Sequence, residues 1–371
     1  MRSAFLGIFV TVVAATLLIP ATGQGPAKKA GVSADKVDAV AAKAAAFLKS
    51  TQGADGSFSP KIAGPGVSAL VASALLRNGY GVKDPVVAKA LAYLESQVQK
   101  DGGVYNKFLA NYTTSVALMT FAEANKDGQY DAVIKSARDF IKKIQHDDAE
   151  NNPTHGGFSY DGKKKPDMSN SGFSVEALIA AGVPKDDPSI RKALKFISRS
   201  QNLPGEFNDQ PFAKNTGEDD KGGFVYNPLA DKDDKNVTPA GGLRSLGAMT
   251  YTGLKSFLYA GVSKEDPRVK AAIGWVRRHY TVDENPGLGK AGLYYYYNTF
   301  AKAMNAWGED HFVDAKGVAH DWRSDLFDAL AKRQAIDGSW QNTGDRTFAE
   351  ENRDLATAFA LISLSYCKEK R

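Results

Sequence analysis

Residues 334–340 read Gln-Ala-Ile-Asp-Gly-Ser-Trp: a glutamine, three residues, a glycine, one residue and an aromatic side chain. The same pattern occurs in three other places, at Gln52-Gly56-Phe58, Gln99-Gly103-Tyr105 and Gln201-Gly205-Phe207. Each copy lies between two apolar stretches with helical periodicity. A pattern that recurs at intervals of roughly 50 residues indicates a repeat architecture.

Each repeat unit is predicted to be two helices joined by the glutamine–glycine–aromatic turn. Aspartate followed by proline starts three of the first helices, because aspartate caps free N–H groups and proline suits the first turn. No useful strand-like alternation is present. First helices are predicted at 37–50, 88–98, 133–144, 190–200, 269–280 and 324–333. Second helices are predicted at 67–77, 113–124, 172–181, 245–260 and 355–366. The second helix of unit five is predicted to pass through Phe300 and Ala303.

Six helical hairpins in two layers predict an all-α fold, an (α/α)6 toroid with the second helices as the inner ring. The turn glycine permits positive φ, the aromatic side chain can pack between hairpins, and the glutamine can bond a neighbouring helix end. We therefore interpret these recurring side chains as structural: Gln52, Phe58, Gln99, Tyr105, Gln201, Phe207, Gln334 and Trp340.

The N-terminus has the pattern of an export signal. Arg2 precedes an apolar run from Ala4 to Ile19, and small residues follow at 21–23. The run is shorter than the roughly 20 residues of a membrane-spanning helix, which favours cleavage over anchoring. We expect a signal peptide at 1–23, a linker at 24–33 and one toroid domain at 34–371, with an insertion at about 208–242. The protein is expected to be exported, either periplasmic or secreted, with no transmembrane segment after cleavage.

Charge and cysteine content narrow the function. The net charge of +5 comes from interspersed residues, which indicates no nucleic-acid partner. The single cysteine, Cys367, excludes an internal disulfide and is interpreted as a small buried hydrophobe. No phosphate loop, dinucleotide fingerprint or metal spacing is present, so neither a cofactor nor a metal is expected.

The glutamine–glycine–aromatic copies resemble the QW repeats of squalene–hopene cyclases, in the wider prenyltransferase/squalene-cyclase repeat superfamily. The resemblance covers roughly residues 34 to 367. Residues 334–340 have the full tryptophan form, and the other copies have Phe or Tyr. The resemblance implies the terpenoid cyclase/prenyltransferase-like toroid, a fold that hosts several chemistries.

Triterpene cyclases of this family use an Asp-x-Asp-Asp motif whose middle aspartate protonates the substrate. Asp231-Lys232-Asp233-Asp234 matches by position, so the resemblance implies Asp233 as the acid, with Asp231 and Asp234 beside it. The cyclase motif continues with Thr-Ala, whereas Lys235 and Asn236 follow here within the polar insertion. A solvated acidic loop is the interpretation that we favour.

Side chains on the predicted inner helices are the other ligand-binding candidates. Tyr251 and Lys255 are four residues apart and share a helix face, as do Asn298 and Lys302. Burial on a cavity face would lower the pKa of such a lysine. The run 294–297 is four tyrosines, of which about two can face the axis. Ordinary charged helix ends and ring packing remain open as alternatives. The candidates are Tyr251, Lys255, Tyr294, Tyr297, Asn298, Lys302 and Arg244.

Three classes of function remain open. We favour an exported toroid that binds an apolar or isoprenoid-like ligand in a central cavity, with catalysis unproven. One alternative is a terpene cyclase/mutase-type isomerase with Asp233 as the acid. The other is a carbohydrate-active lyase or hydrolase, which a groove with several carboxylates and arginine would favour. The partner would be an apolar small molecule or a glycan, and the oligomeric state is left open.

Overall fold

Helices form nearly all of the regular structure in residues 30–369, the part of the chain that this computed structural model describes. The expected signal peptide at 1–23 and most of the expected linker lie outside the described residues. The outer helices are α1 (Ala34–Thr51), α4 (Pro85–Ser96), α6 (Asp131–Lys143), α8 (Pro188–Arg199), α11 (Pro267–Arg278) and α13 (Trp322–Arg333). The inner helices are α3 (Gly66–Arg77), α5 (Ala110–Ala124), α7 (Met168–Ala180), α10 (Gly247–Tyr259), α12 (Leu293–Trp307) and α14 (Arg353–Leu364).

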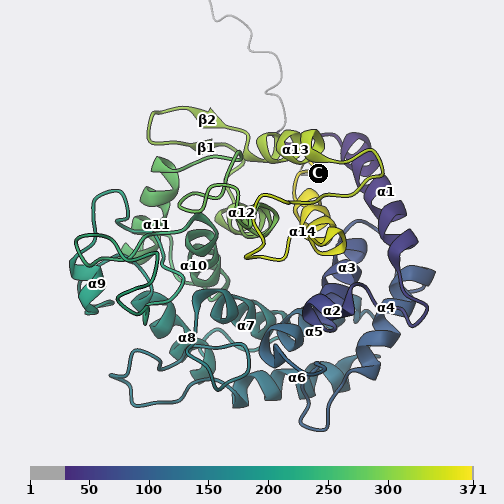
Figure 1. Ribbon diagram of the computed structural model, residues 1–371, viewed down its shortest axis with the longest axis horizontal. Helices are drawn as coiled ribbons and strands as arrows, with labels where there is room; N and C mark the ends of the chain where they lie inside the picture. The colour runs from purple at the N-terminus through teal and green to yellow at the C-terminus, as the bar shows by residue number, and fades with distance from the viewer. Residues whose placement is uncertain (1–29, 370–371) are drawn as a thin grey trace, which may run out of the picture.

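These helices form the two concentric rings of an all-α toroid, as the repeats predict (Figure 1). Each inner helix contacts the next inner helix around the axis, and α14 returns to α3, so the inner ring is closed. The inner helices are apolar on nearly all sides; the first ten residues of α3, for example, are all buried. The outer helices bury one face only, as α8 does with Ile190, Ala193 and Phe196.

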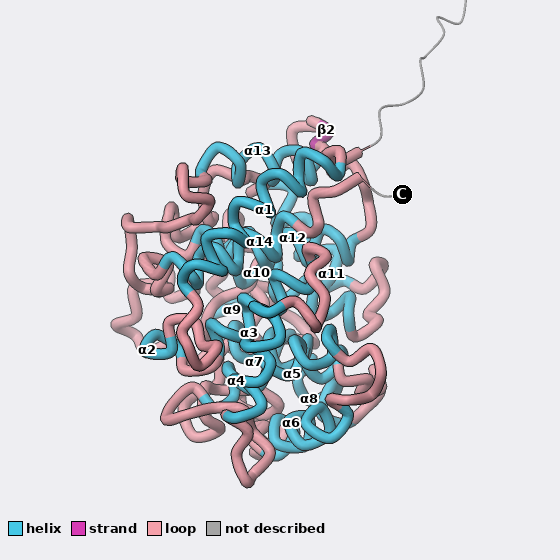
Figure 2. Tube along the Cα trace, turned by 90° about the vertical axis from the view of Figure 1, so that its right-hand side faces the viewer, coloured by secondary structure: helices cyan, strands magenta, loops and turns pink. Residues whose placement is uncertain are grey.

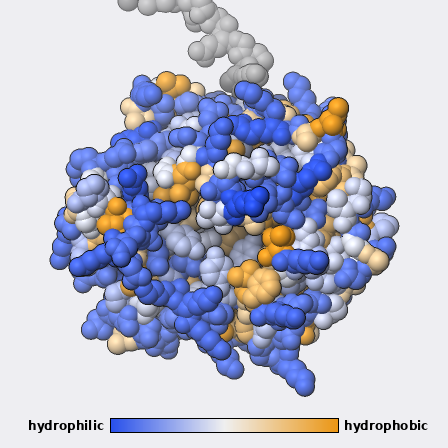
Figure 3. Space-filling view, viewed as in Figure 1, coloured by the Kyte–Doolittle hydropathy of each residue, from blue (hydrophilic) through white to orange (hydrophobic). Residues whose placement is uncertain are grey.

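The two ends of the ring carry different connections. The turns from outer to inner helices gather at one end, called the front end, which faces the viewer in Figure 1. The links from inner helices to the next unit gather at the opposite, back end. Figure 2 shows these two sets of loops on either side of the helices. The inner helices therefore all begin at the front end, and that face is hollowed at its centre, inside a largely hydrophilic rim (Figure 3).

A repeated hydrogen-bond pair joins four of the turns to the next outer helix. In the first unit, Gln52 Nε2 donates to the carbonyl of Gly56 in its own turn (3.2 Å) and to that of Val86 in α4 (2.9 Å). Three other glutamines repeat this geometry. These are Gln145 with Gly156 and Ser189, Gln201 with Gly222 and Arg268, and Gln334 with Gly338 and Val40.

The turn glycine and the aromatic residue also have fixed places. Gly56 has φ +89°, and a Cβ there would lie 2.2 Å from the carbonyl oxygen of Lys89. Only glycine fits so close to a neighbouring backbone. Two residues later, the N–H of buried Phe58 donates to Ser68 Oγ on the inner helix (2.9 Å). The same N–H to hydroxyl bond occurs at Val104–Thr114, Phe158–Ser171, Phe224–Thr250 and Trp340–Thr357.

In units two and four, the residue that makes the N–H to hydroxyl bond is not the aromatic residue of the sequence pattern. In unit four the buried aromatic residue is Phe224 rather than Phe207, because the insertion separates Gln201 from its turn glycine. Phe207 lies against the guanidinium of Arg268, 4.3 Å from its ring centroid. In unit two, buried Val104 takes the aromatic position and Tyr105 is half-buried. Gln99 is one residue out of register and bonds Gln97 and Tyr105 within its own turn.

Smaller elements lie outside the rings. The short helices α2 (Pro60–Ala63) and α9 (Pro211–Lys214) belong to the front turns. A two-stranded antiparallel sheet, β1 (Phe312–Val313) with β2 (Ala319–His320), lies in the link before α13; the sequence does not indicate these strands. Within residues 30–369, no helix combines the length and apolarity that crossing a membrane requires.

A seam closes the ring where the last unit meets the first. Gln334 Nε2 donates to Val40 O in α1 at 3.0 Å. Val32 pairs with Lys368 in a parallel bridge, and Lys368 Nζ lies 2.6 Å from Asp38 Oδ1. The first and last described segments therefore lie side by side, and this junction uses the same glutamine bond as those between other units.

Candidate functional site

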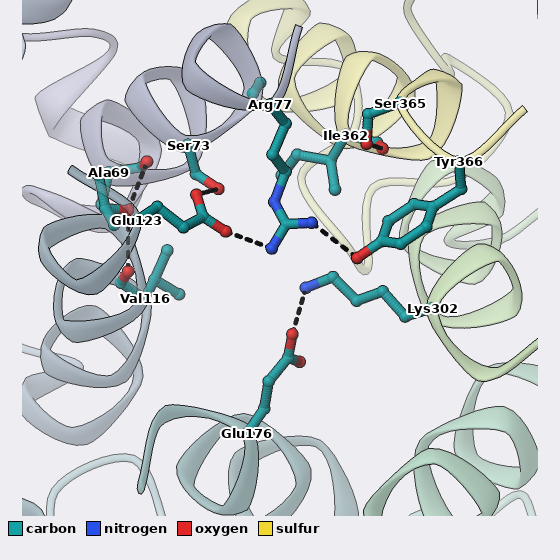
Figure 4. Close-up of polar contacts among 12 residues, drawn as sticks. Ala69, Ser73, Arg77, Val116, Glu123, Glu176, Lys302, Ile362, Ser365 and Tyr366 are labelled. Atoms are coloured by element: carbon teal, nitrogen blue, oxygen red, sulfur yellow. Dashed lines mark hydrogen bonds and ion pairs between the residues drawn. The ribbon is translucent and has the colours of Figure 1, made fainter. Parts of the chain in front are cut away.

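Three charged side chains meet on the ring axis toward its back end. Glu176 of α7 accepts from Lys255 of α10 through Oε2 (2.5 Å) and from Lys302 of α12 through Oε1 (2.7 Å). All three side chains are less than a tenth exposed. Figure 4 shows Lys302 and Glu176 reaching toward each other from facing helices. Two lysines predicted from separate helices thus share one carboxylate, which the sequence analysis did not single out.

The pairing decides the charge of this cluster. Burial opposes ionisation of Glu176, but Lys255 and Lys302 outweigh burial and lower the Glu176 pKa to about 2. Burial lowers the pKa of Lys255, and Glu176 only partly offsets that effect. The carboxylate is therefore ionised at neutral pH and compensates buried ammonium charge.

A second ionic group lies beside the first and is partly open to solvent (Figure 4). Arg77 pairs with Glu123 and donates through Nη1 to Tyr366 Oη (2.7 Å), while Ser73 Oγ donates to Glu123 Oε2 (2.6 Å). The side chains of Arg77 and Glu123 are 27% and 21% exposed, so this group reaches the back surface. Together the two groups close the back of the axis with mutual ion pairs.

The front end of the axis has a different chemistry, built from a carboxyl group and tyrosines. Asp167 caps α7, accepting from Asn170 N and Asn170 Nδ2 (both 2.8 Å), and is 4% exposed. Burial raises the pKa of Asp167 to about 6, although the bonds from Asn170 act in the opposite direction. A carboxylic acid with that pKa is partly protonated near neutral pH, so it can donate as well as accept.

Four tyrosines surround this carboxyl group and are coupled electrostatically to it or to one another. Tyr160 and Tyr226, from the turns of units three and four, have hydroxyls 3.5 Å apart. Tyr295 of α12 bonds Ser169 Oγ at 2.9 Å. Burial is the main cause that raises the pKa of all four tyrosines, so each hydroxyl stays neutral. We call Asp167, Tyr112, Tyr160, Tyr226 and Tyr295 the axial mouth.

Aromatic rings line the axis beneath the axial mouth. The Tyr295 ring lies 5.7 Å from Phe348 and 5.8 Å from Phe359, both in unit six, measured between centroids. Phe173 of α7 lies 6.1 Å from Tyr295 and 5.2 Å from Tyr112, edge-on to the latter. Lys255 Nζ is 5.9 Å from the centroid of Phe173, so these rings separate the axial mouth from the ion pairs.

Glu350 is a second front-end carboxyl group with a raised pKa. It is fully buried, accepts from Tyr295 N at 2.8 Å through Oε1 and from Asn342 Nδ2 at 2.9 Å through Oε2. Burial raises its pKa to about 7, against the opposing effect of these hydrogen bonds. Glu350 thus links the loop of unit six to the first turn of α12.

The remaining predicted ligand-binding residues occupy varied places. Asn298 is buried on α12, one turn before Lys302. The Tyr251 ring packs between Tyr296 and Phe300, at 5.6 and 5.0 Å. The other three lie away from the axial mouth: Tyr294 and Tyr297 donate to the backbone carbonyls of Gln341 and Val282, and Arg244 is exposed near the insertion.

The predicted acidic motif lies on the insertion. Asp231 and Asp233 are exposed, and Asp231 Oδ1 pairs with Lys165 Nζ at 3.1 Å. Asp234 Oδ1 accepts from Asn236 N at 2.8 Å, which shapes the local turn. Within residues 30–369, these carboxylates form no hydrogen bond or ion pair with the Glu176 cluster or with the axial mouth.

Sequence reasoning missed Glu176 and Asp167, and from the tyrosine run 294–297 it selected Tyr294 and Tyr297 rather than Tyr295. Glu176 is the one acidic residue within α7, whose other side chains are apolar or small, and this isolation was the available signal. Asp167 precedes α7 at a capping position, which gave a structural explanation that hid its burial. Among residues 30–369, no three His, Cys, Asp or Glu side chains group closely enough to hold a metal ion.

Comparison with known proteins supports the repeat assignment. Residues 62–221 match the family model described as the squalene-hopene cyclase C-terminal domain. This match confirms the resemblance to the squalene-cyclase repeat superfamily, and it runs from the turn of unit one into the insertion of unit four. No curated protein matches the chain.

Solved structures with the same fold include carbohydrate-active proteins. An alpha-1,6-mannanase, GH76A from Salegentibacter sp. HEL1_6, is 12% identical with a TM-score of 0.59, over 90% of this chain and 98% of that one. An inactive variant of it was solved in complex with alpha-1,6-mannotriose. A polysaccharide lyase is 10% identical with a TM-score of 0.55, over 90% and 96%. A glycosyl hydrolase of family 88 from Bacteroides vulgatus is 9% identical with a TM-score of 0.53, over 90% and 99%. Identities this low show the fold alone.

Proposed function

Starting from a toroid of squalene-cyclase-like repeats, we propose that this protein binds a glycan at the axial mouth. The observation that supports this most is the convergence of four tyrosines and the buried carboxyl group of Asp167 at the open end of the inner ring. The front face is hollowed at this end (Figure 3).

The chemistry of the axial mouth suits a ligand with many hydroxyl groups. A tyrosine hydroxyl both donates and accepts hydrogen bonds, and its ring offers an apolar face. Asp167 donates when protonated and accepts when ionised. A sugar ring presents the matching combination of hydroxyl groups and C–H faces. An apolar ligand would leave the remaining hydrogen-bonding capacity of these groups unused.

The fold is compatible with this proposal. A mannanase with the same fold was solved with a mannotriose bound, although the low identity transfers no residue role. Within the present chain, Asp167 and Glu350 are the candidates for acid catalysis, because burial keeps both carboxyl groups partly protonated near neutral pH. Glycoside hydrolysis ordinarily uses such a pair of carboxyl groups.

An apolar ligand, the function that the sequence favours, is the second candidate. The rings of Phe173, Phe348 and Phe359 around Tyr295 support it, since an isoprenoid chain would pack against them. The terpene cyclase alternative depends on Asp233, which is exposed on the insertion. That alternative therefore relies on the motif resemblance alone.

Binding measurements separate the first two candidates. Residues 24–371 would be titrated calorimetrically with neutral oligosaccharides, including α-1,6-mannotriose, and with polyuronate fragments. We expect one class to bind, and Asp167→Asn to weaken it while the exposed back-end control Asp186→Asn does not. The same preparation would be extracted with organic solvent and analysed by mass spectrometry. A stoichiometric lipid together with no oligosaccharide binding would contradict the glycan proposal and support the apolar one.

We also propose that the chain is exported after cleavage near residue 23, as one domain with an insertion. The apolar run at 4–19 and the small residues after it support this. Intact mass spectrometry of the protein recovered from its native compartment would show loss of residues 1–23. A full-length chain retained with the membrane fraction would contradict the proposal.

A further inference from the structure

We propose that a second pocket, on the rim of the front end, binds a single neutral pyranose unit. Its cavity measures about 240 Å³ and lies between α11, the insertion and the segment that leads into α10. Because it shares no residue with the axial mouth, this proposal does not rest on the function proposed above. We call it the rim pocket; its lining residues are Asp219, Asp220, Thr238, Arg244, Ser245, Trp275, His279 and Gly287.

Trp275 provides an unused hydrogen-bond donor in the wall of the rim pocket. The side chain is 2% exposed, and its Nε1 has no partner among residues 30–369. The ring is held in place by stacking on His279, with centroids 4.1 Å apart and planes 16° apart. Buried indole N–H groups usually find an acceptor, and this unpaired one belongs to a residue that lines the cavity.

Arg244 is a second free donor in the rim pocket. Its side chain is exposed, and its guanidinium forms no hydrogen bond or ion pair within the described chain, although its charge acts on Asp220. A guanidinium presents five N–H groups in one plane and can bond two neighbouring oxygens at once. Arg244, a ligand-binding candidate from the sequence, thus lines a cavity in the structure.

Carboxylates supply the acceptors beside these donors. Asp220 Oδ1 accepts from Ser245 N at 2.6 Å, which fixes the side chain, and Oδ2 has no bond within residues 30–369. Asp219 Oδ1 lies 3.0 Å from His279 Nε2, while His279 Nδ1 lies 3.0 Å from Trp275 O. These bonds orient the imidazole of His279, and the indole of Trp275 stacks on it.

The mixture of donors and acceptors selects the ligand class. A bare anion would face the carboxylates of Asp219 and Asp220, and a bare cation would face the guanidinium of Arg244. Hydroxyl groups satisfy both kinds of partner, because each donates one hydrogen bond and accepts others. The cavity has the volume of about eight water molecules, which is room for one sugar ring and its hydroxyls.

Ligand-observed saturation-transfer NMR on residues 24–371 tests the rim pocket. The probes are the methyl pyranosides of mannose, glucose and galactose, with sodium glucuronate as the anionic comparison. We expect a signal from at least one neutral pyranoside and binding at least tenfold weaker in Arg244→Ala and in Trp275→Phe, which removes the N–H and keeps an aromatic ring. The exposed insertion residue Lys232, changed to Ala, is the matched control and keeps the signal.

Two further measurements keep the result decisive. Asp167→Asn alters the axial mouth, so a signal that persists in this variant and disappears in Arg244→Ala assigns binding to the rim pocket, even where the axial mouth binds nothing. Arg244 is exposed, so we expect Arg244→Ala to have the melting temperature of the wild type. This variant therefore still tests the proposal if Trp275→Phe does not fold. No signal from any neutral pyranoside, a signal from glucuronate alone, or unchanged binding in Arg244→Ala would overturn the proposal.

Discussion

The front and back ends of the ring axis are built by the same six inner helices, yet their buried carboxyl groups have different partners. At the back end, Glu176 neutralises Lys255 and Lys302, and Glu123 pairs with Arg77. At the front end, Asp167 and Glu350 are buried without any cationic partner within the described chain. The back end is already satisfied by its own side chains, whereas the front end keeps hydrogen-bonding capacity for something else.

Removal of the shared carboxylate at the back end is expected to have the largest effect on stability. Glu176→Gln leaves two buried ammonium groups without a counter-charge, so we expect the free energy of unfolding to fall by about 3–5 kcal/mol. Urea denaturation monitored by circular dichroism measures it. Glu150→Gln, which breaks the exposed pair with Lys195, is the control and should change nothing measurable. A stable Glu176→Gln protein that no longer binds glycan would instead make the back end the functional one.

Turn glycines at the two ends should also respond unequally. Gly56 in a front turn and Gly79 after α3 at the back have nearly the same φ, +89° and +91°. A Cβ on Gly56 would lie 2.2 Å from Lys89 O, whereas nothing lies within 4 Å of one on Gly79. We expect Gly56→Ala to cost about 3 kcal/mol and Gly79→Ala about 1 kcal/mol. Equal losses of unfolding free energy in the two variants would contradict this prediction. They would show that the front turn can move away from the next outer helix at little cost.

The front carboxyl groups predict a specific dependence on pH. Burial raises the pKa of Asp167 to about 6 and that of Glu350 to about 7, so folding favours their protonated forms. Their contribution is therefore complete below the unfolded pKa near 4 and is lost as the pH rises through 6 and 7. Between pH 4 and 8 we expect wild type to lose about 2 kcal/mol relative to Asp167→Asn in parallel urea titrations. A pH-independent difference between the two proteins would contradict the assigned burial effect.

The smallest effect concerns a single hydroxyl group. If the axial mouth binds glycan, Tyr226→Phe removes one bonding group and should weaken binding by about 1 kcal/mol, or roughly fivefold in Kd. Tyr297→Phe is the matched control, because its hydroxyl bonds Val282 O away from the axial mouth. Calorimetric titration with the best-binding oligosaccharide measures both. Equal weakening in the two variants would remove the distinction between the axial mouth and the packing around it.

The fold was predictable because its signals are local. The aspartate caps at Asp84, Asp187 and Asp266 bond the N–H groups of Val86, Ser189 and Arg268, as the sequence predicts. The structural equivalent of Gln52 in unit three, Gln145, was missed because it lies eleven positions rather than four before its turn glycine, Gly156. Spacing along the chain does not reveal a contact that forms across a loop of variable length.

The candidate site was only half predictable for the same reason. Four-residue spacing on an inner helix was enough to select Lys255 and Lys302. Their partner Glu176 lies 79 and 126 residues away along the chain, and only ring closure brings the three together. Asp167 and Tyr295 likewise come from units that are not consecutive. Side chains that converge on an axis are defined by the whole ring rather than by any one repeat.

The seam described above has a topological consequence. Val32 and Lys368 are adjacent. Gln334 donates a hydrogen bond to α1, in the same way that other turn glutamines donate to the outer helix of the next unit. A short peptide could therefore join the two ends while a new opening is cut in a back link such as 181–186, between α7 and α8. The circularly permuted chain would keep every unit-to-unit junction, with the order of synthesis changed and the closed ring preserved.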